Sequence, residues 1–412
     1  MTATSHAREP RHFTTRSAFV AAAALAAATL LPLVSSNPAT AANAVSCNAW
    51  TRVAGVGTGS TWSALDGVDA RTGSDVWAVG HIGNPSAPLI EHWNGSKWKR
   101  VHAANPYAGR SYTGSARLTD VDAVSRHDAW AVGLASSKSG RLHTLVEHWN
   151  GKKWSIVPSP DMSSATSTLS TLRRVAAVSS TDAWAIGVWT PRLATDGIGR
   201  GLIEHWNGKQ WSIVDGPEPG SFSDLDGIAA RSATDIWVAG WYLDDGGNSD
   251  AMAEHWDGQQ WTLQAPLQPD AVNNAFNAIA PMPGGGLMAV GDRYFDGVAP
   301  TRALTESWDG QQWTVGEPEQ PGSVTELDGV AAFGSGSALA VGVTRDSTGV
   351  DRTLAQRWDG TSWTVETSPS RGSSPSQLTD VSALQSGRAW AVGSAVLSDD
   401  PGNQRLLLLT RC

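Results

Sequence analysis

One unit of about fifty residues recurs along most of this chain, and it constrains the fold more than any other feature. Aligned on the first apolar residue of each copy, the steps are 53, 54, 53, 51, 51 and 51 residues, at Leu65, Leu118, Leu172, Leu225, Phe276, Leu327 and Leu378. A fixed period of this size is typical of a solenoid, a propeller or an array of repeats. We therefore expect many copies of one supersecondary unit.

Each unit divides into four segments of strand length. In the second copy these are residues 118–124, 129–133, 144–149 and 154–158, all rich in Val, Trp and Leu and bounded by turn formers. No window carries a helical period of useful length. Asn-Gly or Asp-Gly separates the third and fourth segments, as at Asn150-Gly151, and this is the strongest short hairpin signal. The pattern predicts an all-β propeller with four antiparallel strands per blade.

Tryptophan is placed by the repeat. Of 21 Trp, 18 occupy the second segment, the end of the third or the start of the fourth. Large rings at equivalent positions fill the space between blades that stack face to face, so most of these side chains are expected in the core rather than in ligand sites. The four histidines at one repeat position, His92, His148, His205 and His255, are interpreted likewise. They lie too far apart in a ring to share one metal ion, so we expect half-buried, hydrogen-bonded side chains.

Residues 1–44 are interpreted as a signal peptide. A basic start with Arg8, Arg11 and Arg16 precedes an Ala-rich apolar run, and small-x-small cleavage sites end at Ala41 and Ala44. The remaining residues 45–412 form the predicted propeller, and they contain no apolar run long enough for a membrane span. Cleavage changes the formal net charge from −9 to −11, which disfavours nucleic acid as a partner. A secreted, extracellular monomer is expected.

The two cysteines, Cys47 and Cys412, lie near the two ends of the predicted mature chain. Residues 45–53 carry only a fourth segment and residues 378–412 only the first three, so together they complete one blade. Superposition on the second unit places Cys412 at the Trp149 position and Cys47 at the Gly151 position. A disulfide there would replace the missing hairpin turn. The prediction is seven blades, with the ring closed by the N-terminal strand joining the last blade.

Loop lengths point to one face of this propeller. The first-to-second and third-to-fourth links are short, whereas the other two kinds of link share the opposite face and vary in length and composition, as binding loops do. Aromatic and charged residues that lie outside the repeat gather there and are the candidate ligand-binding set: Tyr107, Tyr112, Trp189, Trp241, Tyr242, Asp244, Asp245, Asp292, Arg293, Tyr294, Arg345 and Asp346. Aromatic rings can stack on a ligand, and the charged groups beside them can bind hydroxyl groups or chain termini. This combination suits a sugar or a peptide.

Carboxylates in the first segment, which lines the channel, allow two interpretations. Asp66, Asp120, Asp226, Asp328 and Asp380 form a ring that suits a hard cation such as Ca²⁺, or they accept backbone N–H groups. The second interpretation is preferred, so no metal site and no cofactor is predicted.

The second-strand motif W-A-V-G and the hairpin motif E-H-W-[ND]-G-x-x-W resemble the kelch and galactose-oxidase-like propellers of secreted bacterial proteins. The resemblance covers residues 47–412 and implies the fold. Kelch units carry a double glycine after the first strand, whereas here a single glycine such as Gly133 ends the second. The copper chemistry of galactose oxidase requires a further cysteine that this chain lacks. The hairpin W-D-G-Q-Q-W-T also looks like the Asp-box of sialidases, but its Asp-to-Trp spacing is one residue short.

These observations favour a binding module for carbohydrate or an extracellular protein, acting through the loop-rich face without catalysis. The alternative is a carbohydrate-active enzyme, a glycoside hydrolase or lyase, on the same face, because paired carboxylates such as Asp244 and Asp245 are present. A structural or adhesion module is the third hypothesis. None of the nucleophile-elbow, zinc-protease or P-loop motifs occurs.

Overall fold

The computed structural model describes residues 49–56, 62–107, 114–162, 167–191, 199–269, 273–294, 300–397 and 400–412. The predicted signal peptide and Cys47 lie outside these residues. Residues 47–412 form one compact unit. Its described part is all-β, as predicted, and every element is a strand.

The strands repeat in sets of four, which match the four segments expected from the sequence. The first strands are β2 (Ser63–Thr72), β6 (Ala116–Ser125), β10 (Ser167–Ser179), β14 (Phe222–Ser232), β18 (Asn273–Pro281), β22 (Thr325–Phe333) and β26 (Ser376–Ala383). The second strands are β3 (Asp75–Ile82), β7 (Asp128–Ser136), β11 (Asp182–Pro191), β15 (Asp235–Leu243), β19 (Leu287–Tyr294), β23 (Ser337–Arg345) and β27 (Ala389–Leu397).

The outer strands complete each set. The third strands are β4 (Ala87–Trp93), β8 (Leu142–Trp149), β12 (Arg200–Trp206), β16 (Ser249–Trp256), β20 (Arg302–Trp308), β24 (Asp351–Trp358) and β28 (Asp400–Arg411). The fourth strands are β5 (Trp98–Val101), β9 (Trp154–Ile156), β13 (Trp211–Ile213), β17 (Trp261–Gln264), β21 (Trp313–Val315), β25 (Trp363–Glu366) and β1 (Trp50–Arg52).

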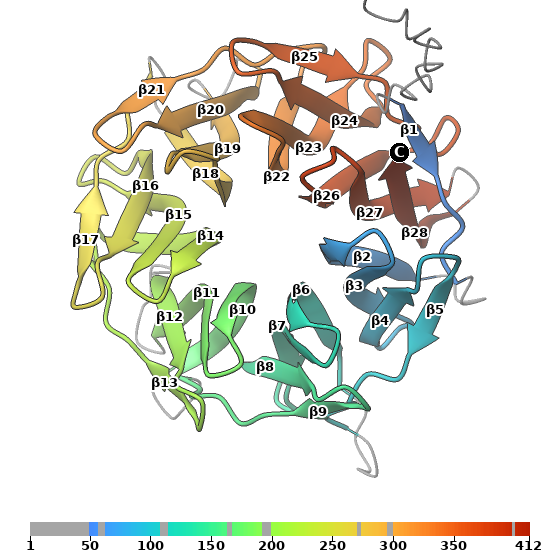
Figure 1. Ribbon diagram of the computed structural model, residues 1–412, viewed down its shortest axis with the longest axis vertical. Coiled ribbons are helices and arrows are strands. Elements are labelled where there is room, and N and C mark those ends of the chain that lie inside the picture. Colours follow the sequence, from blue (N-terminus) through green and yellow to red (C-terminus); the bar gives the residue numbers. More distant parts are fainter. Residues whose placement is uncertain are drawn as a thin grey trace, which may run out of the picture. The chain divides into compact units, whose positions relative to one another are not determined.

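Each set pairs as an antiparallel meander in chain order. We number the sets repeat 1 (β2–β5) to repeat 6 (β22–β25). Strand pairing joins the sheets of repeats 2 and 3 at a single described position, Leu169 with Leu142. The last set is a composite sheet in the order β26, β27, β28, β1, because the N-terminal strand pairs with the C-terminal one. The sets are arranged around a central axis with their first strands innermost (Figure 1).

The core lies between neighbouring sheets. The second-strand Trp77, Trp130, Trp184, Trp237 and Trp390 are at most 3% exposed, and the seven fourth-strand Trp are at most 8% exposed. The third-strand Trp are half-buried. Trp77 of repeat 1 contacts Trp149 and Trp154 of repeat 2, and Trp130 repeats this contact with Trp206 and Trp211. The prediction that the repeat tryptophans are mainly core residues is confirmed.

A β-bulge interrupts every pairing of first and second strands at the same repeat position. In repeat 2 the register shifts between Leu118 and Asp120, so Thr119 is the extra residue. Opposite the bulge stands the glycine of W-A-V-G: a Cβ on Gly133 would lie 2.1 Å from the carbonyl oxygen of Arg117. The single glycine of the sequence motif therefore makes room for a bulge, which turns two successive residues toward the central axis.

The composite sheet corrects one alignment made from the sequence. Trp50 pairs with Arg411, as Trp154 pairs with Trp149 in repeat 2. Arg411, and not Cys412, therefore occupies the Trp149 position, and the superposition was wrong by one residue. The cause is local: the run of leucines in β28 lacks the landmarks of the other third strands. Cys412 is exposed just beyond β28, and its pairing with Cys47 stays a prediction.

Candidate functional site

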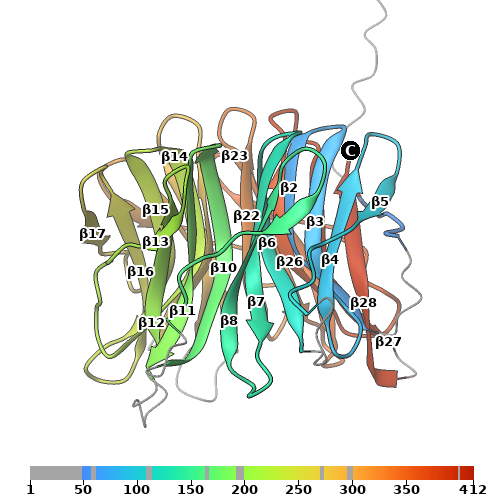
Figure 2. The same cartoon turned by 90° about the horizontal axis from the view of Figure 1, so that it is seen from below.

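The first strands line a central channel, which contains two cavities on either side of Arg174. One cavity, of about 660 Å³, lies where first strands begin and second strands end. This is the face with the second-to-third links, which is the lower face in Figure 2, where β7 is joined to β8. The other, of about 610 Å³, lies toward the short hairpins that join first and second strands. Arg174 lines both cavities. We call them the loop-face cavity and the hairpin-face cavity.

Arg174 reaches across the channel from β10. Its Nε donates to the carbonyl of Asp226 at 3.2 Å, and its Nη2 donates to the carbonyls of Asp328 at 3.2 Å and Thr379 at 3.5 Å. These acceptors belong to β14, β22 and β26, so one guanidinium joins four sets of strands. Burial alone would lower the pKa of the Arg174 guanidinium. The negative charges of Asp380 and Asp120 outweigh this effect, so the pKa lies above its ordinary value. The side chain forms the floor of the loop-face cavity.

The wall of the loop-face cavity carries a second arginine held by carboxylates. Arg173 contacts Asp224 through Nη2 and Asp226 through Nη1, the latter at 3.1 Å. Burial raises the pKa of Asp224 to about 7, and the negative charge of Asp226 adds to the shift. Burial and the charge of Glu326 raise the pKa of Asp328 to about 8. Near neutral pH these carboxyl groups can therefore donate as well as accept protons.

The same cavity contains an aromatic platform and further polar groups. Trp241, half-exposed at the end of β15, lines it and stacks on Phe222 with a centroid distance of 4.6 Å. Arg117, Asn277, Gln377 and Thr379 also line it. The cavity thus combines an indole ring, guanidinium donors and carboxyl acceptors, and its volume lies in the range of ligand pockets.

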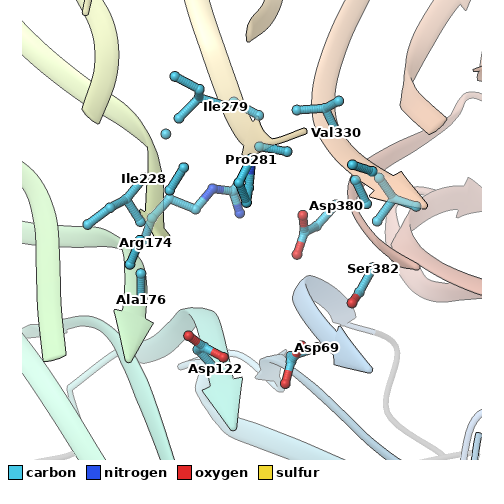
Figure 3. A pocket seen from close by; sticks show the side chains of 18 of the residues that line it. Asp69, Asp122, Arg174, Ala176, Ile228, Ile279, Pro281, Val330, Asp380 and Ser382 are labelled. Carbon is cyan, nitrogen blue, oxygen red and sulfur yellow. The ribbon is translucent and has the colours of Figure 1, made fainter. Parts of the chain in front are cut away.

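The hairpin-face cavity is lined by small apolar residues and by carboxylates, some of which accept hydrogen bonds from the backbone of neighbouring strands (Figure 3). Asp380 accepts the N–H of Val68, Asp120 that of Val175 and Asp122 that of Ala177, at 2.7–2.8 Å. Burial raises the pKa of Asp120 to about 8 and that of Asp122 to about 6. These carboxyl groups join β26 to β2 and β6 to β10.

The expected ring of carboxylates divides by its position relative to the bulge. Asp66, Asp226 and Asp328 are bulge residues and line the loop-face cavity, whereas Asp120 and Asp380, one position later, line the other cavity. The backbone-acceptor interpretation holds for the latter two. In the described residues, no group of three or more His, Cys, Asp and Glu side chains is arranged to hold a metal ion.

Two of the candidate ligand residues line cavities. Trp241 lies in the loop-face cavity, and Trp189 lines a separate pocket between repeats 3 and 4. Asp292 is connected to the first cavity through Asn277, whose Nδ2 donates to its carboxylate at 3.1 Å.

The other described candidates lie outside both. Tyr107 donates to the carbonyls of Ser115 and Ser136, and Tyr242 donates to Asp250. Asp244, Arg345 and Asp346 bond within their own loops. Asp245 is exposed, Tyr294 at the end of β19 is 41% exposed, and Arg293 precedes it in the same strand. Tyr112 lies outside the described residues.

Sequence reasoning missed the arginines. Arg117, Arg173 and Arg174 line the loop-face cavity but were not among the candidates. A signal was present: repeat 3 has Arg173-Arg174 at the bulge, where five other units have Asp-Gly or Thr-Asp and repeat 5 has Asn277-Ala278. Residues that break a repeat at a position facing the axis are better candidates than residues of variable loops.

The four repeat histidines behave as expected. His92, His148, His205 and His255 are 26–28% exposed, and each bonds through Nε2 to the Asp that opens a second strand, at 2.7–3.0 Å. Each ring also packs on the second-strand Trp of its own sheet, as His92 does on Trp77. They are structural side chains.

Among the described residues there is no helix of the length and apolar character needed to cross a membrane. No family model matches the sequence, and neither does any curated protein.

Solved structures do resemble the chain. YCF48 bound to D1 peptide has a TM-score of 0.53 at 13% identity, with 88% of this chain and 97% of that chain covered. An ulvan lyase of polysaccharide lyase family PL25 has a TM-score of 0.55 at 10% identity, covering 84% and 93%. The polysaccharide lyase Uly1 has a TM-score of 0.50 at 10% identity, covering 84% and 89%. At these identities the similarity shows the fold alone, and that fold is the β-propeller.

Proposed function

We propose that this chain is a secreted, closed seven-bladed β-propeller of the kelch-like type that binds carbohydrate in the loop-face cavity. Closure is supported by the pairing of β1 with β28 and by contacts of β2 with the composite sheet, including the bond from Val68 to Asp380. In this proposal a disulfide between Cys47 and Cys412 joins the chain ends, residues 1–44 direct export, and the mature protein is a monomer.

The observation that carries the ligand class is the composition of the loop-face cavity. Trp241 offers a flat apolar face, on which the C–H face of a pyranose stacks. Arg173, Asp224 and Asp226 offer donors and acceptors side by side, which match hydroxyl groups that are themselves both. The cavity is walled by side chains of first and second strands, and this combination of an indole ring with paired donors and acceptors is the ground for preferring carbohydrate to peptide.

An enzyme at the same cavity is the second candidate. It is supported by Asp224 and Asp328, whose pKa values of about 7 and about 8 suit a general acid or base near neutral pH. Two of the similar propellers are polysaccharide lyases by name and the third has a bound peptide, so the fold leaves these classes open.

The test uses the protein from Val45 and a panel of cell-wall and plant polysaccharides, with retention and released products measured together. Retention without products is expected. Trp241→Ala should weaken retention at least tenfold, since stacking supplies much of the contact, while Tyr294→Ala, which removes an exposed ring outside the cavity, should not change it. Arg117→Ala is a second variant of the cavity lining, and it removes a side chain that is exposed. Products would establish the enzyme, and no retention across the panel would contradict carbohydrate binding.

A further inference from the structure

A buried Glu or Gln side chain on the third strand connects several repeats to the link that precedes them. Glu147, in the E-H-W motif, is fully buried and accepts the N–H of Ala104 at 2.8 Å. Ala104 belongs to the link that precedes its repeat. Glu306 accepts the N–H of Leu267 at 3.0 Å, and Gln356 accepts that of Glu319 at 2.9 Å. In all three cases the donor lies six residues after the fourth-strand Trp.

In repeat 4 this donor is missing. The sixth residue after Trp211 is Pro217, which has no N–H. Glu254 is only 1% exposed, and within the described part of the chain its Oε2 has no hydrogen-bond partner. Burial raises the pKa of Glu254 to about 8, compared with about 7 for Glu147 and Glu306, which have donors. An unpaired buried acceptor of this kind is costly unless a ligand supplies the donor.

A pocket of about 370 Å³ lies against this carboxyl group, between repeats 3 and 4. Trp189 lines it together with apolar side chains that include Met162, Ile203 and Leu225. Gly216 brings the link close, since a Cβ there would lie 3.0 Å from Oε2 of Glu254. The volume suits one sugar ring, and the indole offers a face for it.

Among the described residues that line the pocket, the ionisable side chains have one sign of charge. Its ionisable lining residues are Glu254, Asp215 and Glu218, all acidic. Arg200 stands nearby but is paired with Glu218. An acidic pocket with an aromatic wall favours a cationic group, which binds carboxylate and ring face together.

We propose that this pocket binds the ammonium group of an amino sugar, with Glu254 as its counter-ion and Trp189 against its ring. The inference rests on the proposed carbohydrate function and specifies a second subsite for it. The two sites are adjacent in the structure. On β11, Val188 lines the loop-face cavity and the next residue, Trp189, lines this pocket. On β14, Asp224 and Leu225 are divided between the two sites in the same way. An oligosaccharide that enters both sites would present its amino sugar to Glu254.

Calorimetry with D-glucosamine as the probe and D-glucose as the neutral control tests the proposal. Glucosamine should bind at least tenfold more tightly than glucose, and its binding should release a proton near pH 7 as Glu254 ionises. Glu254→Gln should abolish this preference. Pro217→Ala should reduce it several-fold, because the restored N–H competes for the carboxylate. Glu306→Gln, a matched change at a carboxyl group that has its donor, should leave it intact.

Equal binding of the two sugars, no glucosamine binding, or an unchanged preference in Glu254→Gln would overturn the proposal. The experiments distinguish failure of this proposal from failure of the proposed function. Trp241→Ala should reduce retention of neutral polysaccharides and leave glucosamine binding unchanged, whereas Glu254→Gln should do the reverse.

Discussion

Arg174 forms hydrogen bonds with sets of strands that are not neighbours of its own set in the chain. Its guanidinium donates to carbonyl groups of β14, β22 and β26, and the last two belong to sets that do not adjoin repeat 3 in chain order. The three acceptors, Asp226, Asp328 and Thr379, are the extra residues of their bulges, where the ladder of strand hydrogen bonds is locally disrupted. A planar fork of donors fits several such acceptors at once.

Arg174→Met should therefore lower the free energy of unfolding by about 1–3 kcal/mol, since it leaves carbonyl groups and the carboxylates of Asp120 and Asp380 without their donor and cation. Urea unfolding measures the effect. Arg117→Ala, at an exposed arginine of the same channel, should change it by less than about 0.5 kcal/mol. An unchanged urea midpoint in Arg174→Met would show that the contacts across the channel add nothing to stability.

At this scale the sequence predicted classes of residue better than individual sites. The histidines and tryptophans could be assigned to structure because their repetition forbids a single site. The roles of Tyr107 and Asp346 could not be predicted from the sequence. These loop side chains form hydrogen bonds with backbone groups of their own loops, and those loops do not follow the repeat. Arg173 and Arg174 required knowledge of the bulge, which turns two successive residues inward.

Among the elements, β1 and β28 form the join between the two chain ends. Trp50 is buried, and its Nε1 donates to Glu366 at 3.0 Å. Arg411 contacts the same carboxylate through Nε at 2.9 Å and Nη2 at 2.8 Å, and its Nη1 donates to the carbonyl of Gly387. Glu366 belongs to β25, so this cluster fastens the composite sheet to repeat 6. A guanidinium here takes the place that an indole holds in the other third strands.

Trp50→Ala should destabilise the protein by about 3–5 kcal/mol through loss of the buried ring, and it should expose the N-terminal segment to protease at native conditions. Trp98→Ala is the matched control, because Trp98 holds the same position within repeat 1 and its Nε1 has no partner. It should cost a similar free energy without exposing the N-terminus. If both variants were equally resistant to N-terminal cleavage, β1 would not be the closing strand.

Element boundaries followed closely from the turn chemistry. Asn-Gly and Asp-Gly accept positive φ, and the glycines of these hairpins, such as Gly151 at 84°, adopt it. The composite sheet was foreseen because each chain end lacks what the other supplies. Its register was missed by one residue, since side-chain identity in a Leu-rich strand does not specify which residue faces Trp50.

For the molecule as a whole, the period, the four strand-length segments and the hairpin signals together predicted an all-β propeller, but the chemistry of the protein depends on how its carboxyl groups are buried. Glu91, Glu147, Glu204, Glu254 and Glu306 are 0–1% exposed between sheets. Burial raises their pKa values to about 7 for Glu91, Glu147 and Glu306 and to about 8 for Glu204 and Glu254. Asp120 and Asp224 in the channel are raised to about 8 and about 7 by the same cause.

The direction of the resulting pH dependence follows from proton binding. In the unfolded chain these groups ionise near pH 4–4.5, whereas in the folded protein they keep their protons up to about pH 7–8. Between these values the folded state binds more protons, so the free energy of unfolding falls as pH rises. Their stabilising contribution is complete below pH 4 and is lost through pH 8.

The free energy of unfolding in urea should therefore fall by more than about 3 kcal/mol between pH 5 and pH 8, given about 1.4 kcal/mol for each tenfold difference in proton affinity. Gln356 already holds the equivalent position in repeat 6, where its Nε2 donates to the carbonyl of Glu319. Replacing Glu204 and Glu254 with Gln should accordingly flatten the profile, since neither has a backbone donor to lose. A midpoint that rose steadily from pH 5 to pH 8 would mean that these carboxyl groups ionise inside the folded protein as readily as in water.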